Sequence, residues 1–135
     1  MTSDILELAR RGDPLALTRS LVSTPSVNPQ LEKGGSGERE AATLVAEWLD
    51  LWGLDTQVSE ISPNRFNVIG TLQGDGPTLL LNGHLDTVGV RGMTVPPFDA
   101  KVSGGRIWGR GSCDMKAGLA AILAATKRLT EEGPR

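Results

Sequence analysis

Apolar residues recur at helical spacing between residues 41 and 52, and this is the clearest pattern in the chain. The apolar stripe consists of Ala41, Leu44, Val45, Trp48, Leu49 and Trp52. Residues spaced i, i+3, i+4, i+7, i+8 and i+11 share one face of an α-helix, so the pattern predicts a helix with one buried face. Gly53 follows the stripe and suits the left-handed conformation that ends many helices.

Two other segments also have helical patterns. Residues 4–23 predict a helix in two pieces, because Asp13 can cap a new helix and Pro14 fits its first turn. Residues 116–132 predict a further helix, which Gly133-Pro134 ends. Its helical spacing is set by Leu119, Ile122, Leu123 and Thr126. The many alanines of this segment favour close packing against a sheet.

Between these helices the pattern changes to that of strands. Residues 56–61, which alternate in polarity, and residues 67–72 predict two strands. Residues 78–82 form a continuous apolar run, which predicts a central strand covered on both faces. Residues 89–105 contain four glycines and two prolines and predict a long loop, followed by a short strand at 106–109. This order of elements predicts a layered α/β domain with a mixed sheet.

Composition adds few constraints. The 135 residues suit one domain, with 39% hydrophobic and 22% charged residues. A net charge of -2 gives no reason to expect nucleic acid or an anionic membrane as a partner. No apolar run approaches the roughly 20 residues of a membrane span, and the N-terminus lacks the plan of a secretory signal. The single cysteine cannot form an internal disulfide, so we expect a cytoplasmic protein.

The candidate chemistry lies where two of these elements end or begin. His84, the only histidine, and Asp86 follow the apolar run, and residues two apart in extended backbone point to the same side. A carboxylate beside an imidazole can fix the tautomer of the imidazole. Asp114 follows the glycine-rich segment 109–111 at the start of the last helix. One imidazole and two carboxylates are suitable groups for a divalent metal site, and zinc accepts both kinds of donor.

Other interpretations of these residues are weaker. Gly109-Arg110-Gly111 resembles part of a dinucleotide loop, but the third glycine and the following acidic residue are lacking. Cys113 suggests a Cys-His nucleophile, but its neighbours do not match a cysteine-hydrolase signature. His84 could also be a packed side chain, Asp86 a turn residue and Asp114 a helix cap. The last two roles are compatible with metal binding.

Three stretches of the chain together resemble a known family. Residues 21–29, 83–88 and 108–118 are similar to the zinc metallopeptidases and amidohydrolases that include acetylornithine deacetylase, succinyl-diaminopimelate desuccinylase, aminoacylase and glutamate carboxypeptidase. The resemblance implies a layered α/β/α zinc-exopeptidase-like domain that hydrolyses amide bonds of N-acyl amino acids or small peptides. It also implies a site with two zinc ions, or with cobalt or manganese in their place.

The resemblance also implies roles for individual residues. His84 would be a ligand of one zinc ion, and Asp86 would act in catalysis as the acidic partner that orients His84. Asp114 would be the carboxylate that bridges the two ions. Attack of a metal-bound water on the amide carbonyl would then follow, with the ions stabilising the developing oxyanion.

The chain also departs from the family pattern. Members of the family supply a Glu-Glu pair and a second histidine from later sequence, and this chain offers neither. Glu131-Glu132 is unsuitable, because a helix rising about 1.5 Å per residue carries it roughly 25 Å from Asp114. Ala117 stands where many relatives have glycine. We therefore expect residues 1–135 to be the N-terminal portion of a catalytic domain, without its remainder and without the smaller dimerisation or lid domain.

Alone, such a portion is expected to bind zinc weakly and to be inactive, because one histidine and two aspartates cannot close a tetrahedral site. Two alternatives are a non-catalytic chain that only associates with a partner and a half-enzyme completed by a second chain. An open sheet edge and uncovered apolar faces also predict a homo-oligomer.

Overall fold

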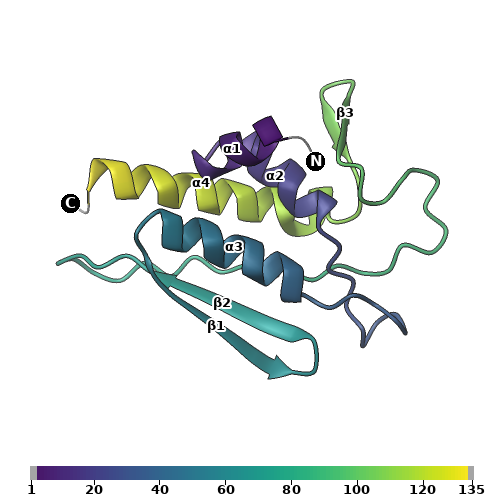
Figure 1. Cartoon of the computed structure of the whole chain (residues 1–135), viewed down its shortest axis with the longest axis horizontal. Coiled ribbons are helices and arrows are strands. Elements are labelled where there is room, and N and C mark those ends of the chain that lie inside the picture. Colours follow the sequence, from purple (N-terminus) through teal and green to yellow (C-terminus); the bar gives the residue numbers. More distant parts are fainter. Residues whose placement is uncertain (1–2, 134–135) are drawn as a thin grey trace.

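The computed structural model describes residues 3–133 and contains helices and two small sheets (Figure 1). The helices are α1 (Ser3–Arg10), α2 (Pro14–Ser23), α3 (Arg39–Leu51) and α4 (Ala117–Glu132). A short turn, η1 (Ser112–Lys116), comes directly before α4, and its residues Asp114 and Met115 have non-helical backbone angles. The strands are β1 (Asp55–Ser62), β2 (Arg65–Thr71), β3 (Lys101–Ser103) and β4 (Arg106–Trp108). The predicted α/β class is confirmed.

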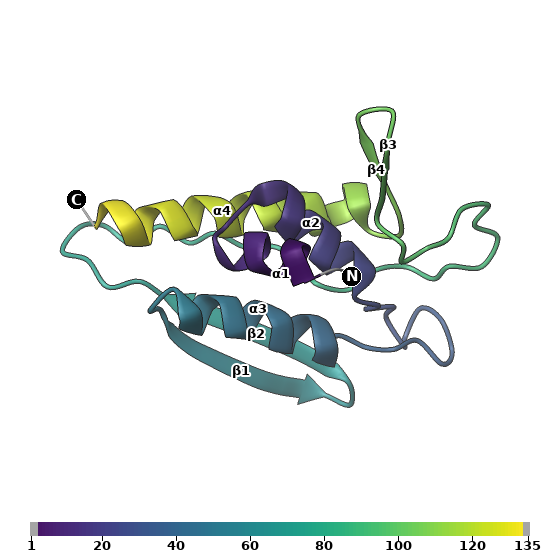
Figure 2. The same ribbon diagram turned by 45° about the horizontal axis from the view of Figure 1, so that its top comes forward.

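The elements form layers around one apolar core. Helix α3 packs on β1 and β2, while α2 contacts both α1 and α4 (Figures 1 and 2). Buried side chains from α2, α3 and α4 meet between these layers. The core includes Leu17, Leu21, Val45, Trp48, Leu49, Trp52, Leu54 and Leu123. The predicted stripe of α3 is therefore the face that joins the hairpin to the other helices.

Local sequence signals set the ends of the helices as predicted. The Asp13 carboxylate accepts a hydrogen bond of 2.8 Å from the Ala16 N–H, and Pro14 opens α2. Gly53 has a φ of +82° just after α3. Helix α4 ends at Glu132, while Pro134, the other part of its predicted stop signal, lies outside the described residues.

Both sheets are antiparallel hairpins. Strands β1 and β2 pair from Asp55 with Thr71, close to the predicted ranges. Strand β3 pairs with β4 across Gly104-Gly105, whose φ angles of +61° and +72° suit a two-residue hairpin turn. The prediction of a loop over 89–105 is therefore wrong for residues 101–103.

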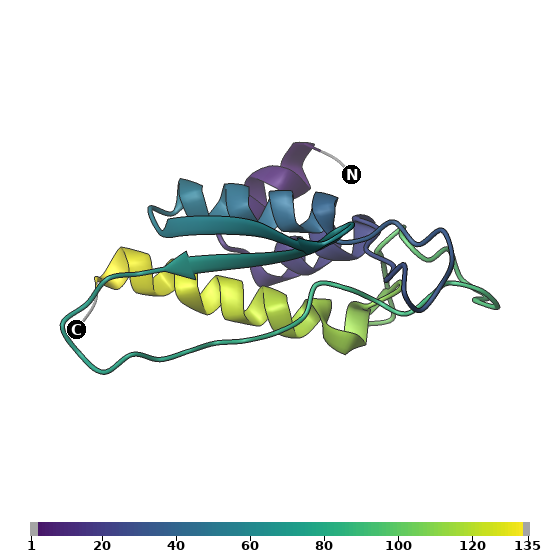
Figure 3. The ribbon, with the colours of Figure 1, turned by 90° about the horizontal axis from the view of Figure 1, so that it is seen from below.

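The prediction of a central strand at 78–82 is also wrong. This segment is extended coil, and Leu79 and Leu80 are 75% and 81% exposed. A strand needs a neighbouring strand for its backbone hydrogen bonds, and among residues 3–133 β1 and β2 pair only with each other. Figure 3 shows the segment passing along α4 instead. The described residues thus form two separate antiparallel sheets and one isolated parallel bridge, Val27 with Thr87, rather than one mixed sheet.

None of the helices within residues 3–133 combines the length and the apolar character that crossing a membrane requires.

Candidate metal centre

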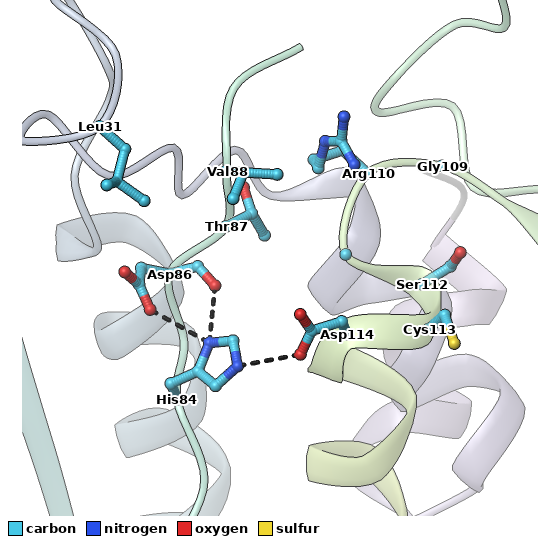
Figure 4. A pocket seen from close by; sticks show the side chains of 11 residues that line it. Leu31, His84, Asp86, Thr87, Val88, Gly109, Arg110, Ser112, Cys113 and Asp114 are labelled. Atoms are coloured by element: carbon cyan, nitrogen blue, oxygen red, sulfur yellow. Dashed lines mark hydrogen bonds and ion pairs between the residues drawn. The ribbon is translucent and has the colours of Figure 1, made fainter. Parts of the chain in front are cut away.

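The three side chains singled out from the sequence meet in the structure (Figure 4). His84 Nδ1 lies 2.9 Å from the backbone oxygen of Asp86 and 3.1 Å from its Oδ1. His84 Nε2 lies 3.1 Å from Asp114 Oδ1. Asp86 and Asp114 therefore contact opposite nitrogens of one imidazole. The two aspartates are 28 residues apart in the sequence, and a loop and a hairpin lie between them.

The backbone that carries His84 and Asp86 is fixed from two sides. The parallel bridge contributes hydrogen bonds of 2.9 Å from Thr87 N to Ser26 O and from Asn28 N to Thr87 O. On the other side, a Cβ added at Gly83 would lie 2.7 Å from Leu119 Cδ2 in α4. The chain therefore passes close to α4 at Gly83, and a larger residue there would require the side-chain ends of Leu119 and Met115 to move.

The turn that carries Asp114 is anchored by a buried lysine. Gly111, with a φ of +80°, leads into η1. Lys116 is fully buried, and its Nζ donates to Leu21 O at 2.8 Å and to Thr24 O at 2.7 Å. Leu21 lies in the last turn of α2 and Thr24 is its C-cap residue, a position where a cation is favourable. Burial lowers the pKa of Lys116 to about 8. The lysine thereby ties η1 to the C-terminal end of α2.

Behind Asp86 lies a polar network that the sequence analysis did not identify. Asn28 Nδ2 donates to Asp86 Oδ2 at 2.6 Å, and Arg65 Nη2 donates to the same oxygen at 3.3 Å. Arg65 Nε in turn donates to Glu38 Oε1 at 2.6 Å. Glu38 and Arg65 are 27 residues apart and follow no periodic pattern, so no signal in the sequence relates them. Only the stretch containing Asn28 had been noted.

The two sides of the imidazole differ in exposure. The side chain of Asp86 is 19% exposed and that of Asp114 is 87% exposed. Partial burial by itself lowers the pKa of His84, but the hydrogen bonds to the Asp86 carbonyl and to Asp114, with the charges of both carboxylates, raise it above the ordinary value of 6.5. The imidazole therefore lies between two carboxylates, and its Nε2 side faces the exposed one, Asp114, which is favourable for a cation.

A cleft of about 360 Å³ opens at this exposed side (Figure 4). Its walls come from the segment after α2, the segment after His84 and the loop before η1. The lining side chains include Leu31, Thr87, Val88, Arg110, Ser112 and Cys113. The three candidate residues thus lie at an open cleft rather than in the packed core.

The pair formed by His84 and Asp114 fits a metal ion. Two donors on a tetrahedral zinc with bonds of about 2.0–2.1 Å lie about 3.3 Å apart. The observed separation between Nε2 and Oδ1 is 3.1 Å. Asp86 lies against the other nitrogen, the usual position for a carboxylate that orients a metal-bound histidine. Within residues 3–133, no group of three or more His, Cys, Asp or Glu is arranged to hold a metal, so this pair would fill half of a four-coordinate site.

Comparison with known proteins agrees with the resemblance of the motifs. Residues 80–135, which contain all three candidate residues, match the model of peptidase family M20/M25/M40. The succinyl-diaminopimelate desuccinylase of Cereibacter sphaeroides is 40% identical over 127 residues, which is 90% of this chain and 31% of the relative. That of Gluconacetobacter diazotrophicus is 37% identical over 129 residues, 88% of this chain and 30% of the relative.

A relative with a different named activity also matches. The N-formyl-4-amino-5-aminomethyl-2-methylpyrimidine deformylase of Halalkalibacterium halodurans is 35% identical over 122 residues, 85% of this chain and 28% of the relative. The chain belongs to the peptidase family M20/M25/M40, as the resemblance of its motifs implied. It spans about a third of the length of the curated relatives that it matches.

Proposed function

We propose that this chain contributes the His84–Asp86–Asp114 part of a zinc-dependent hydrolase site that cleaves amide bonds. The observation that carries the proposal is the 3.1 Å separation between His84 Nε2 and Asp114 Oδ1, on the side of the imidazole that Asp86 leaves open. His84 would hold one zinc ion through Nε2, and Asp114 would bridge this ion and a second. Cobalt or manganese are the alternative metals.

The chain's own residues have separate tasks in this proposal. A bound zinc ion supplies activation of a water molecule and of the amide carbonyl. Asp86 accepts a hydrogen bond from the Nδ1–H of His84, which keeps the proton on Nδ1 and leaves the Nε2 lone pair available to a metal ion. Asp114, the exposed carboxylate, adds negative charge at the mouth of the cleft.

The proposed substrates are N-acyl amino acids or small peptides. Both kinds of relative have names that state the removal of an acyl group, succinyl in one and formyl in the other. Arg110 lines the cleft, and its buried Nε has no hydrogen-bond partner among residues 3–133. The Arg110 side chain would provide positive charge for a carboxylate of the substrate, since guanidinium groups bind carboxylates through charge-assisted hydrogen bonds.

The proposal includes an incomplete site. Residues 1–135 would be the N-terminal portion of a catalytic domain whose remaining ligands and general base come from further sequence or from a second chain. The exposed Leu79 and Leu80 favour a surface that another segment covers. A chain that acts only by associating with a partner through this surface is the second candidate function.

Calorimetric titration of the chain with zinc tests the metal site. We expect weak binding that His84→Gln and Asp114→Asn abolish. The matched control is Asp50→Asn, which removes an exposed carboxylate of α3 outside the cleft and should leave the affinity unchanged. Equal affinity in all four proteins would refute the site.

Adding the complementary segment of a relative and assaying N-succinyl and N-acetyl amino acids separates the two functions, because only the hydrolase site would gain activity.

A further inference from the structure

We propose that Arg65 is a positioning residue that decides which nitrogen of His84 carries the proton. The guanidinium, held by Glu38, fixes the carboxylate of Asp86 so that one oxygen is left for His84 Nδ1–H and Nε2 is left for the metal. This inference rests on the proposed function, because the orientation matters for a site in which Nε2 is the donor atom.

The first step is the fixed position of the guanidinium. Glu38, only 2% exposed, precedes α3, and Arg65 is the first residue of β2. Glu38 Oε1 accepts from Arg65 Nε at 2.6 Å, and Oε2 accepts from Phe66 N at 3.0 Å. Glu38 N donates to Asn64 O at 3.1 Å, so backbone and side chain both join these elements. A buried carboxylate needs such partners, and the charge-assisted bond holds Arg65 in one orientation.

The second step is the choice of oxygen on Asp86. Arg65 Nη2 and Asn28 Nδ2 both donate to Oδ2, at 3.3 Å and 2.6 Å. Arg65 Nη1 also donates to Asn28 Oδ1 at 3.2 Å, and this oxygen accepts from Gln30 N at 2.9 Å. These two bonds require the amide of Asn28 to point its NH2 group at Asp86. Arg65 therefore acts on Asp86 twice, directly and through Asn28.

The third step is the effect on His84. With Oδ2 occupied by two donors, Oδ1 is the Asp86 oxygen that accepts from Nδ1, beside the Asp86 backbone carbonyl. The competing tautomer would place the proton on Nε2, toward Asp114. Asp114 is 87% exposed and so has water as an alternative partner, whereas Asp86 is 19% exposed. The more buried pair of acceptors favours the Nδ1–H tautomer.

The experiment uses the fact that His84 is the only histidine of the chain, so its imidazole gives unambiguous nitrogen NMR signals. Spectra are recorded at a pH where titration of the same signals shows the ring to be neutral. In the unmodified chain we expect Nδ1 to carry the proton. In Arg65→Gln the shifts of the two nitrogens should move toward each other as both tautomers become populated. The affinity for zinc should fall about tenfold or more, as for other groups that orient a metal ligand.

Two further variants separate positioning from a structural role. Arg65→Gln leaves the buried charge of Glu38 unpaired, so Glu38→Gln/Arg65→Gln removes this charge as well and is the variant to use if the single one unfolds. If Arg65 only neutralised Glu38, the double variant should recover both the stability and the imidazole spectrum of the unmodified chain. If Arg65 positions Asp86, the mixture of tautomers should persist in the double variant. Arg39→Gln is the matched control, because Arg39 pairs with Glu60 at 3.3 Å in the neighbouring exposed ion pair.

An unchanged imidazole spectrum in the folded double variant would overturn the role of Arg65. The failure of the proposed function has a different signature, because the unmodified chain would then bind no zinc while the tautomer still responded to Arg65.

Discussion

The buried Lys116 allows a quantitative test of how the turn bearing Asp114 is held. Its Nζ reaches the last carbonyls of α2 from a position with no exposed surface. Burial disfavours the charged form of an amine, and it lowers the pKa of Lys116 from 10.5 to about 8. Replacing Lys116 with methionine removes this group while keeping a long apolar side chain in its place.

The sign of the effect follows from where the proton is bound. Between pH 8 and 10.5 the unfolded chain still carries the lysine proton, whereas the folded chain has lost it. The free energy of unfolding therefore rises with pH across this range. This gain in stability is lost as the pH falls through the pKa of Lys116 in the folded chain. At 1.36 kcal/mol for each pKa unit, the expected gain is about 3 kcal/mol. The Lys116→Met chain should lack this rise.

Urea unfolding followed by tryptophan fluorescence measures the effect, since Trp48 and Trp52 are buried in the core and the chain has no tyrosine to titrate near pH 10. The quantity to compare is the difference in unfolding free energy between the unmodified and variant chains at pH 7 and pH 10.5, because titrations common to both cancel. Lys101→Met, which removes an exposed lysine, is the control. Parallel pH profiles for the unmodified and Lys116→Met chains would refute the reasoning.

Three further substitutions test a helix cap, the approach of Gly83 to α4 and a hydrogen bond between helices. Asp13→Ala should cost about 1 kcal/mol in urea unfolding, because it removes the cap of α2, and no loss of stability would contradict that role. Gly83→Ala should destabilise the chain by no more than about 1 kcal/mol by thermal unfolding, because the side-chain ends of Leu119 and Met115 can move away from the new Cβ, and a much larger loss would show that these side chains cannot move. Trp52→Phe should cost about 1 kcal/mol in urea, because it removes the 2.7 Å bond to Arg10 O, and a neutral effect would show that this bond is dispensable.

Features that depend on local chemistry could be predicted from the sequence. The stripe of α3 is periodic, so its burial follows from the helix itself. Asp13 and Pro14 define the start of α2 because capping involves only a few consecutive residues. The proximity of His84 to Asp86 follows from their spacing of two, and the motif comparison indicated that Asp114 would join them.

Features that depend on contacts between distant segments could not be predicted in the same way. The apolar character of residues 78–82 indicates that they favour burial, but it cannot specify a neighbouring strand, and the described chain does not provide one. The short strand predicted at 106–109 is confirmed as β4, but its partner β3 was missed because a strand of three residues is too short to show alternation. Arg65 and Glu38 were missed because a partly buried ion pair joins two positions that no sequence pattern relates.

The two carboxylates around His84 differ in the property that their proposed tasks require. An orienting carboxylate must keep one oxygen directed at Nδ1, and this needs donors on the other oxygen and little competition from water. Asp86 meets both conditions. A metal-binding carboxylate must instead be accessible to an ion and to the ligands that complete its coordination, and Asp114 is exposed. If the tasks were exchanged, the ion would have to displace the Arg65 guanidinium from Asp86, and it would face a like charge. The asymmetry of burial therefore supports Asp114 as the metal-facing carboxylate and Asp86 as the orienting one.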